Sequence, residues 1–418
     1  MLEKILRLLK TYIIPKSIFN LARPSYHYFL AGLSAFFYGF PSKKLKVIGV
    51  TGTKGKSSTV YLLSRIFDAA RLKNAVLSSI EIKINGEIQP NFQKMTMPGR
   101  FFIQKFLAEA VSSGCEFAIL ETTSEGIKQF RHKFIDFEAA VFTNLSPEHI
   151  ESHGSFEKYR QAKLELFQAV KKIHIINADD PSAKYFLEIP AAKKIQYGKN
   201  NNSFGSLDLK LEGEFNYYNA LAAGETALAL DVDKEIIKKA LASVETISGR
   251  FEYINAGQDF KVVVDYAHTP DSLEKVYQTI KVKDKDARLI CVLGAAGGGR
   301  DKWKRPVMGE IAAKYCDKII LTNEDPYDEN PSRILSEIKS GISNSPASRT
   351  GRQFLFSNLF EILDRKKAIQ KALGLAKKDD FVIIIGKGSE KWMMLENGKK
   401  IPWDERETVK EILKGRKI

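Results

Sequence analysis

The stretch KVIGVTGTKGKSSTV at residues 46–60 constrains the fold more than any other part of the chain. KVIGV is a short run rich in β-branched residues, and residues 56–72 repeat apolar side chains at the spacing of one helix face. A glycine-rich loop between a strand and a helix is the setting in which backbone N–H groups bind phosphate oxygens. The stretch therefore predicts a phosphate-binding loop at the edge of a sheet.

This loop departs from the usual pattern G-x-x-x-x-G-K-[ST], because Val50 stands where the first glycine is expected. Gly49 and Gly52 flank that position instead. In such a loop Lys56 would neutralise the terminal phosphates, and the Ser57 hydroxyl would reach Mg²⁺. An ordinary glycine-rich turn is the alternative, since a lone Gly-Lys-Ser is a modest signal.

The composition is that of a soluble globular chain. It has 418 residues, 44% of them hydrophobic and 28% charged, which predicts two to three domains. Its net charge of +15 favours acidic partners such as nucleotides and anionic lipid. We see no nucleic-acid-binding motif and expect no nucleic-acid partner. Three cysteines without metal or redox spacing are typical of a reducing cytoplasm.

Strands alternate with helices along most of the chain, which predicts mostly parallel sheets covered on both faces. A first series has expected strands at 116–121, 139–144 and 172–177 and helices at 99–112 and 155–170. Residues 178–212 show little periodicity, and a helix begins near Tyr217. A second series, after residue 248, has expected strands at 261–267, 288–295, 318–324 and 381–388.

We therefore predict an α/β fold in three parts. These are a short basic and aromatic helical segment at 1–45, a central P-loop parallel-sheet ATPase domain at 46–248, and a Rossmann-like α/β domain at 249–418.

The N-terminal segment carries eight basic residues and one acid within residues 1–46. Its apolar run, SYHYFLAGLSAFFYGF, has 16 residues, fewer than the roughly 20 that span a bilayer. No cleavage site for a secretory signal is evident. Two interpretations remain open. The segment is an interfacial helix on a membrane, or its large side chains pack against the central domain: Tyr28, Phe29, Leu33, Phe36 and Phe37.

Single residues elsewhere are ambiguous when each is taken alone. Glu121 ends an expected strand, at the edge where α/β sheets bind ligands, and a carboxylate there could hold Mg²⁺. It is equally well explained as a surface acid. His149 and His153 follow another strand end, where loop histidines are usually solvated. Lys163 lies on an expected amphipathic helix, where a surface lysine is ordinary.

Taken together, the stretches resemble the Mur ligases, most closely the UDP-N-acetylmuramoyl-tripeptide synthetases of the MurE type. In order they are GVTGTKGKSST, TMP, LETTSEGIKQFR, AAVFTNLSPEHIESHGSFEKYRQAKLELF, FNYYNALAA, SGRFE, VVDYAHTPDSLEKV, GGGRDKWKRPVMGEIA, LTNEDPYDENP and IIIGKGSEKW. They cover roughly 46–410. The loop of this family is TG[TS]xGK[ST], so the missing glycine is normal for it.

The resemblance implies an ATP-dependent ligase of peptidoglycan synthesis, acting as a cytoplasmic monomer on a muramoyl-peptide precursor and a free amino acid. The γ-phosphate of ATP goes to a carboxylate, and the amine then displaces phosphate from the acyl phosphate. This order is chemically sensible because oxide is a poor leaving group and phosphate a good one. Cations must stabilise the transferring phosphoryl group.

Residue roles carry over from the family's motifs. Catalysis is assigned to Lys56, Glu121, His149 and Lys163. Two Mg²⁺ ions are assigned to Ser57, Glu121, His149 and Lys163, the last as a carbamate. Nucleotide binding is assigned to Thr51, Gly52, Thr53, Lys54, Gly55, Lys56, Ser57, Ser58, Asn144, Asn216, Asn219, Arg250, Asp265 and His268. The muramoyl-peptide side is assigned to Thr96, Ser124 and Arg131, and the amino-acid side to Arg300, Glu324, Asp325 and Glu390.

Three departures from the family pattern concern the substrates. Residues 1–45 do not resemble the family's uridine-binding domain. Glu125 and Met97 stand where a histidine and a threonine are usual. The motif EDPY places Tyr327 where diaminopimelate enzymes have the arginine of DNPR. We therefore expect an amino acid with a distal amine, such as lysine or ornithine, rather than meso-diaminopimelate.

Two other functions remain as alternatives. Folylpolyglutamate synthetases share the TGTKGKxST loop and the ligase chemistry, but DYAHTPD, EDP and GKGSE favour the Mur ligases. A non-catalytic, membrane-associated scaffold is disfavoured because the residues assigned to catalysis are all present.

Overall fold

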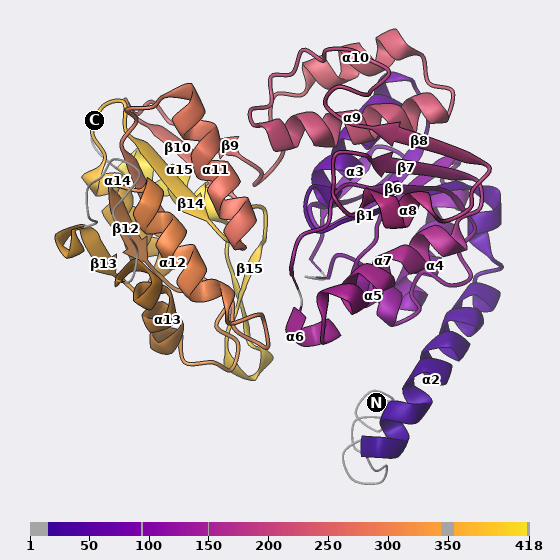
Figure 1. Cartoon of the computed structure of the whole chain (residues 1–418), viewed down its shortest axis with the longest axis horizontal. Coiled ribbons are helices and arrows are strands. Elements are labelled where there is room, and N and C mark those ends of the chain that lie inside the picture. Colours follow the sequence, from indigo (N-terminus) through magenta and orange to yellow (C-terminus); the bar gives the residue numbers. More distant parts are fainter. Residues whose placement is uncertain (1–15, 93–94, 149, 344–354, 416–418) are drawn as a thin grey trace.

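The computed structural model describes residues 16–92, 95–148, 150–343 and 355–415. Two bodies, each built around a sheet, lie side by side, and the helix α2 (Lys16–Phe37) projects from the first of them (Figure 1). Both sheets are mainly parallel, so the predicted α/β fold class is confirmed.

The first sheet has the strand order β4-β3-β2-β5-β1-β6-β7-β8. β1 pairs in parallel with β5 on one side and with β6 on the other, while β3 and β4 form an antiparallel edge. The inner strands read as continuous apolar runs because both faces are covered. Their bounds are β1 (Lys46–Thr51), β2 (Asn74–Leu77), β3 (Glu81–Ile84), β4 (Glu87–Pro90), β5 (Phe117–Glu121), β6 (Phe137–Phe142), β7 (Ile173–Asn177) and β8 (Lys193–Tyr197).

Helices form two hydrophobic cores, one on each face of this sheet. One core contains α3 (Lys56–Ala69), α9 (Glu214–Ala229) and α10 (Lys234–Ser243). The other contains α4 (Arg100–Ser112), α5 (Ser124–Lys128), α7 (Phe156–Ala169) and α8 (Ala183–Leu187). A short helix, α6 (Ile150–His153), precedes α7, and a 3₁₀ turn, η1 (Pro41–Lys44), precedes β1.

The second sheet has the order β13-β12-β11-β14-β10-β9, with only β9 antiparallel to its neighbour. Its strands are β9 (Glu252–Tyr253), β10 (Lys261–Asp265), β11 (Leu289–Leu293), β12 (Lys318–Leu321), β13 (Leu359–Glu361) and β14 (Phe381–Ile385). One face packs on α11 (Pro270–Lys283), α12 (Lys304–Tyr315) and α13 (Pro331–Ser343), and the other on α14 (Arg365–Leu375) and α15 (Glu405–Gly415). The hairpin of β15 (Trp392–Met394) and β16 (Lys400–Pro402) follows β14, and the short 3₁₀ turns are η2 (Phe356–Asn358) and η3 (Glu396–Gly398).

The chain passes from one sheet to the other between α10 and β9. The division at residues 45 and 248 stays a prediction. The expected strands and helices are present, with ends shifted by a few residues. Residues 178–212, which show little periodicity in the sequence, contain α8 and β8. β8 is an edge strand with four of its five residues partly or fully exposed, so its sequence lacks an apolar run.

The described part of the N-terminal segment forms the helix α2 over Lys16–Phe37, whose large side chains between Tyr28 and Phe37 remain largely exposed. Ala31, Ser34 and Ala35 are buried, and α2 lies beside α4. The side chains expected to pack on the central domain are exposed by 42 to 73%: Tyr28, Phe29, Leu33, Phe36 and Phe37. Two of them still make ring contacts, Tyr28 with Phe130 and Phe134, and Phe37 with Phe101. A face of small residues allows the two helices to approach closely, so the packing interpretation holds only in part. Among the described residues, no helix is long and apolar enough to cross a membrane.

Candidate active site

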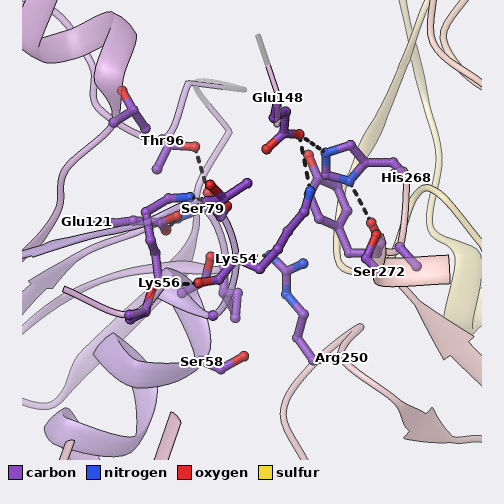
Figure 2. A pocket seen from close by; sticks show the side chains of 18 of the residues that line it. Lys54, Lys56, Ser58, Ser79, Thr96, Glu121, Glu148, Arg250, His268 and Ser272 are labelled. Atoms are coloured by element: carbon purple, nitrogen blue, oxygen red, sulfur yellow. Dashed lines mark hydrogen bonds and ion pairs between the residues drawn. The ribbon is translucent and has the colours of Figure 1, made fainter. Parts of the chain in front are cut away.

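A cavity of about 730 Å³ lies between the two sheets and is lined by loops of both (Figure 2). Most of the predicted site residues line it: Thr53, Lys54, Gly55, Lys56, Ser57, Ser58, Thr96, Glu121, Ser124, Arg131, Asn144, Asn219, Arg250, Asp265, His268, Arg300, Glu324, Asp325 and Glu390. Thr51, Gly52, Asn216 and Lys163 are not part of its lining. His149 lies outside the described residues.

The phosphate loop joins β1 to α3 and is tightly packed. Gly52 has φ 150°, and a Cβ there would lie 1.9 Å from Thr143 Oγ1, so a side chain would open the loop. The Lys56 ammonium donates to the carbonyls of Gly52 at 3.0 Å and Thr53 at 2.8 Å. Burial lowers its pKa, and the carboxylates of Glu121 and Glu148 oppose that shift. The loop therefore presents one buried cation beside backbone N–H groups at a helix start.

Lys163 lies on α7 directly beneath this loop. Its side chain is 1% exposed, and Nζ donates to Gly52 O at 2.7 Å and lies 4.7 Å from the ring centre of Tyr159. Burial lowers the pKa of this amine well below its usual 10.5, and the charge of Lys56 lowers it further. The surroundings thus favour a neutral amine, the nucleophilic form of lysine.

Oxygen donors suited to Mg²⁺ lie at the same edge. Glu121 ends β5, is 3% exposed and accepts from Ser79 N at 2.8 Å. Ser57 lies in the first turn of α3, and its hydroxyl accepts from Arg250 at 3.2 Å. No group of three histidine, cysteine or acidic side chains that could hold a metal occurs in the described part of the chain. Ser57 and Glu121 therefore fit a Mg²⁺ site that phosphate oxygens and water complete, as is usual for this ion.

Glu148 connects the two sheets. Its Oε1 accepts from Lys54 Nζ at 3.1 Å and from His268 Nε2 at 3.2 Å, and Figure 2 shows it between them. Burial and the charge of Lys54 lower the pKa of His268 to about 3, against the effect of Glu148. The other ring nitrogen of His268, Nδ1, lies 2.8 Å from the carbonyl oxygen of Tyr266. Our sequence reasoning missed Glu148, although it directly precedes the predicted His149.

Arg250 makes a second connection. It comes from the segment before β9, reaches Ser57 and stacks 4.3 Å from the ring centre of Tyr266. The preceding Gly249 has φ 65°, and a Cβ there would lie 2.1 Å from Ser389 N, so the connector is held against the loop after β14. Asp265 accepts from Phe251 N and Ala267 N at 2.7 and 2.6 Å. It shapes the turns that carry the nucleotide-side residues.

A third contact joins α6 to the glycine-rich loop before α12. Glu151 N donates to Asp301 Oδ1 at 3.1 Å, and Lys302 N donates to Glu151 Oε1 at 2.9 Å.

On the first sheet's side, Asn219 Nδ2 donates to Asn216 Oδ1 at 3.4 Å. The asparagine pair therefore lies together on α9, as its i, i+3 spacing requires.

The side assigned to the muramoyl peptide contains the two unusual residues. Thr96 and Ser79 share a hydroxyl hydrogen bond of 2.7 Å, and Ser124 Oγ lies 3.2 Å from His153 Nε2. Arg131 donates to the carbonyl of Met97. A hydrogen bond from His153 lowers the pKa of Glu125 to about 2, and Ser152 adds another. Met97 and Glu125 thus hold neighbouring residues in place.

The side assigned to the amino acid is strongly charged. The Lys387 ammonium lies 3.0 Å from both carboxylate oxygens of Asp325 and 2.5 Å from Glu390 Oε2. Glu324 is 4% exposed, and burial raises its pKa to about 7. Its Oε2 is buried without a hydrogen-bond partner among the described residues. Arg300 and Tyr327 both line the cavity on this side. Sequence reasoning missed Lys387, which is visible only as the lysine of GKGSE.

Two family models match the chain. Residues 50–208 match the Mur ligase middle domain, and residues 249–388 match the Mur ligase, glutamate ligase domain. The chain belongs to the Mur ligase family. As a Mur ligase it is an ATP-dependent ligase that forms ADP, which confirms the reaction class expected from its motifs.

Curated relatives share most of this ligase's length. A UDP-N-acetylmuramoyl-L-alanyl-D-glutamate–2,6-diaminopimelate ligase from Syntrophomonas wolfei is 38% identical over 414 residues, covering 93% of this chain and 82% of the relative. A UDP-N-acetylmuramyl-tripeptide synthetase from Treponema denticola is 36% identical over 434 residues. The match covers 92% of this chain and 79% of that relative. The expected likeness to MurE-type ligases is therefore confirmed.

Solved structures agree. A UDP-N-acetylmuramoyl-L-alanyl-D-glutamate–2,6-diaminopimelate ligase has a TM-score of 0.57 at 30% identity, covering 88% of this ligase and 78% of that chain. A folylpolyglutamate synthase of Mycobacterium tuberculosis complexed with ADP has a TM-score of 0.69 at 16% identity. The match covers 92% of this ligase and 95% of that chain. At that identity the second likeness shows the shared fold alone.

Proposed function

We propose that this Mur ligase adds an amino acid to a muramoyl-peptide precursor of peptidoglycan, using ATP. The observation that carries the proposal is the cavity of about 730 Å³ between the two sheets. It brings the phosphate loop, the predicted acceptor residues and the predicted amino-acid residues together. All of these come from one chain, which supports a monomer as the working unit. We place the reaction in the cytoplasm, where ATP is available.

The chemistry has two displacements. An acceptor carboxylate oxygen attacks the γ-phosphorus of ATP, and the bond to ADP breaks. The amine of the amino acid then attacks the acyl carbon, phosphate leaves with the bonding pair, and the amine loses a proton. Lys56 and the loop N–H groups neutralise charge on the transferring phosphoryl group. Mg²⁺, held by Ser57 and Glu121, supplies further neutralisation when bound.

We propose that Lys163 is carbamylated. Its neutral amine attacks the carbon of CO₂ and loses a proton, which converts a cation into an anion. The lowered pKa and the position beneath the phosphate loop support this assignment. An anion there, with His149, would provide for a second Mg²⁺ ion.

We propose an amino acid with a distal amine, such as lysine or ornithine. Glu324 offers a buried carboxylate oxygen, and Arg300 suits the α-carboxylate. Tyr327 offers no charge to a second carboxylate. The names of several relatives favour diaminopimelate as the competing candidate. Comparing kcat/KM for these amino acids distinguishes the two, and a strong preference for meso-diaminopimelate contradicts the proposal.

The test of the function is phosphate release with each amino acid, using UDP-linked and lipid-linked muramoyl dipeptides as acceptors and folates as the control. We expect release that depends on a muramoyl acceptor. Lys56→Ala removes the buried cation and lowers turnover by about 10²- to 10³-fold. Near-normal turnover in that variant, or release that depends only on folate, contradicts the proposal.

A further inference from the structure

The outward face of α2 is apolar, the reverse of the usual arrangement for a surface helix. Phe29, Leu33, Phe36 and Phe37 follow the i, i+4, i+7, i+8 spacing of one helix face, and their exposed fractions are 66, 42, 73 and 71%. We call these four residues the α2 ridge. The opposite face, with Ala31, Ser34 and Ala35, is the one that is buried.

The ridge continues into a groove of about 610 Å³ that α2 forms with the loop after α5. Phe29, Leu33 and Phe36 line it from the helix, and Phe130 and Phe134 line it from the loop. Both loop phenylalanines have left-handed backbones, with φ 57° and 61°. That conformation is costly for a bulky side chain. The loop therefore holds two aromatic rings beside the helix at the expense of backbone strain.

The groove and the active-site cavity share this loop. Arg131, between the two phenylalanines, lines the cavity on the side assigned to the muramoyl peptide. Whatever occupies the groove therefore lies next to that side of the cavity. Figure 1 shows α2 projecting from the body that contains the first sheet.

Basic residues bracket the ridge along the chain. Arg23 precedes it, and Lys43, Lys44 and Lys46 follow it, all exposed. Glu3 is the sole acidic residue before Asp68 in the sequence. An apolar face flanked by cations is complementary to an anionic lipid surface, whose acyl boundary accepts aromatic rings and whose head groups attract lysine and arginine.

We propose that the α2 ridge, with Phe130 and Phe134, is a membrane-binding surface that inserts into the interface of anionic lipid. The ligase lies on the membrane with α2 in the plane of the interface. The acceptor side of the cavity then faces lipid, which suits an acceptor carried on a lipid. This last point rests on the proposed function, whereas the binding itself does not.

The test is flotation of the full chain with vesicles of phosphatidylcholine containing anionic phosphatidylglycerol, without substrates. The ridge variant Phe29→Ser/Phe36→Ser/Phe37→Ser removes three exposed rings that contribute little to the core. Its matched control is Val282→Ser/Leu355→Ser/Leu363→Ser, at positions with exposed fractions of 84, 62 and 46% on the second body. We expect the wild type and the control to float, and the ridge variant to bind at least about tenfold more weakly.

Salt and lipid charge sharpen the test. Binding should weaken in pure phosphatidylcholine and at 1 M salt, where the Debye length is about 3 Å. A wild type that does not float at low salt overturns the proposal, as does equal binding by the ridge variant. Sedimentation without lipid distinguishes another occupant. Dimerisation that the ridge variant abolishes would assign the ridge to a second copy of the chain instead.

Activity separates this proposal from the proposed function. The ridge variant should retain wild-type turnover on a water-soluble acceptor and lose turnover on an acceptor anchored in vesicles. Loss of turnover on both acceptors would overturn the assignment of the ridge to lipid binding. An inactive wild type that still floats would contradict the proposed function alone.

Discussion

Two fully buried lysines, one on each body of the molecule, have opposite surroundings. Lys163 lies beneath the phosphate loop, with the carbonyl of Gly52 as hydrogen-bond acceptor and Lys56 as a like-charged neighbour. Lys387 lies on the amino-acid side and bonds to the carboxylates of Asp325 and Glu390. Burial alone lowers the pKa of both. The carboxylates outweigh it for Lys387, whose pKa is raised.

The difference shows that partners, and not burial, decide what a buried lysine can do. A lysine between two carboxylates stays protonated and acts as a fixed cation that holds a loop. A lysine that donates to a carbonyl beside another cation, and whose neighbouring carboxylates do not outweigh burial, is ready to become a neutral nucleophile. Of the five predictions below, the first three test this contrast and the last two test the charged groups on the amino-acid side.

The largest effect is expected for Lys163→Met. If the carbamate is required, turnover falls about a thousandfold, measured as phosphate release. Removing CO₂ and bicarbonate should slow the wild type reversibly and leave the variant unchanged. A high-resolution map with a bare ammonium at Lys163 and both Mg²⁺ ions bound would contradict carbamylation.

With CO₂ and bicarbonate removed, so that Lys163 is a free amine in the wild type, the same variant should melt at a higher temperature than the wild type. Because the pKa of Lys163 is lower in the folded state than its usual 10.5, the unfolded chain binds the extra proton. Wild-type stability therefore rises as pH rises towards 10.5, and this slope disappears in the variant. A lower melting temperature would show that Lys163 is paired like Lys387.

Lys387→Met should have the opposite effect on stability. It leaves two carboxylates without their cation and lowers the free energy of unfolding by about 3 kcal/mol, measured by urea unfolding. Since the folded pKa is raised, the stabilisation is present below the usual 10.5 and is lost as pH rises through the folded value. Adding Asp325→Asn should recover part of the loss. If Lys387→Met unfolds with the same free energy as the wild type, the proposed difference between Lys163 and Lys387 is contradicted.

Substrate choice is expected to change with Tyr327→Arg. A second cation beside Arg300 can hold a distal carboxylate with a charged hydrogen bond of about 2 kcal/mol, or about 30-fold. The ratio of kcat/KM for meso-diaminopimelate to that for lysine should rise by this factor. Tyr327→Phe is the control and should leave the ratio unchanged. If Tyr327→Arg also leaves the kcat/KM ratio unchanged, residue 327 does not contact the distal group of the amino-acid substrate.

The smallest effect concerns Glu324, whose pKa is raised to about 7. Its carboxylate form, which attracts an ammonium, dominates above that pH and is lost below it. The KM for the amino acid should therefore rise about tenfold from pH 8 to pH 6. Glu324→Gln should flatten this dependence. If KM depends on pH equally in the wild type and in Glu324→Gln, a group other than Glu324 titrates.

Local sequence patterns predicted the fold well but could not find these contrasts. The expected strands at 261–267 and 381–388 contain β10 and β14, because buried parallel strands are continuous apolar runs. The edge strand β8 was missed for lack of such a run. In α2 the periodicity was visible, but which side faced inward depended on the closeness of α4.

The site was predictable only through the family resemblance. Lys163 and Gly52 are 111 positions apart, and Lys387 and Asp325 are 62 apart, so spacing gives no sign of either contact. Locally, Lys163 looks like a surface lysine. Its burial comes from the packing of α7 beneath β1 and its loop, which is a tertiary property.

The connector at Gly249 and Arg250 contacts both the amino-acid side and the phosphate side of the cavity. Gly249 lies against Ser389 on the amino-acid side, and Arg250 reaches Ser57 on the phosphate side. We expect a displacement at one end to shift the other through these contacts. By reciprocity, if ATP tightens the binding of the amino acid by some factor, the amino acid tightens ATP by the same factor. We therefore expect mutual affinity enhancement between the two ligands, and a larger side chain at 249 should abolish it in both directions together.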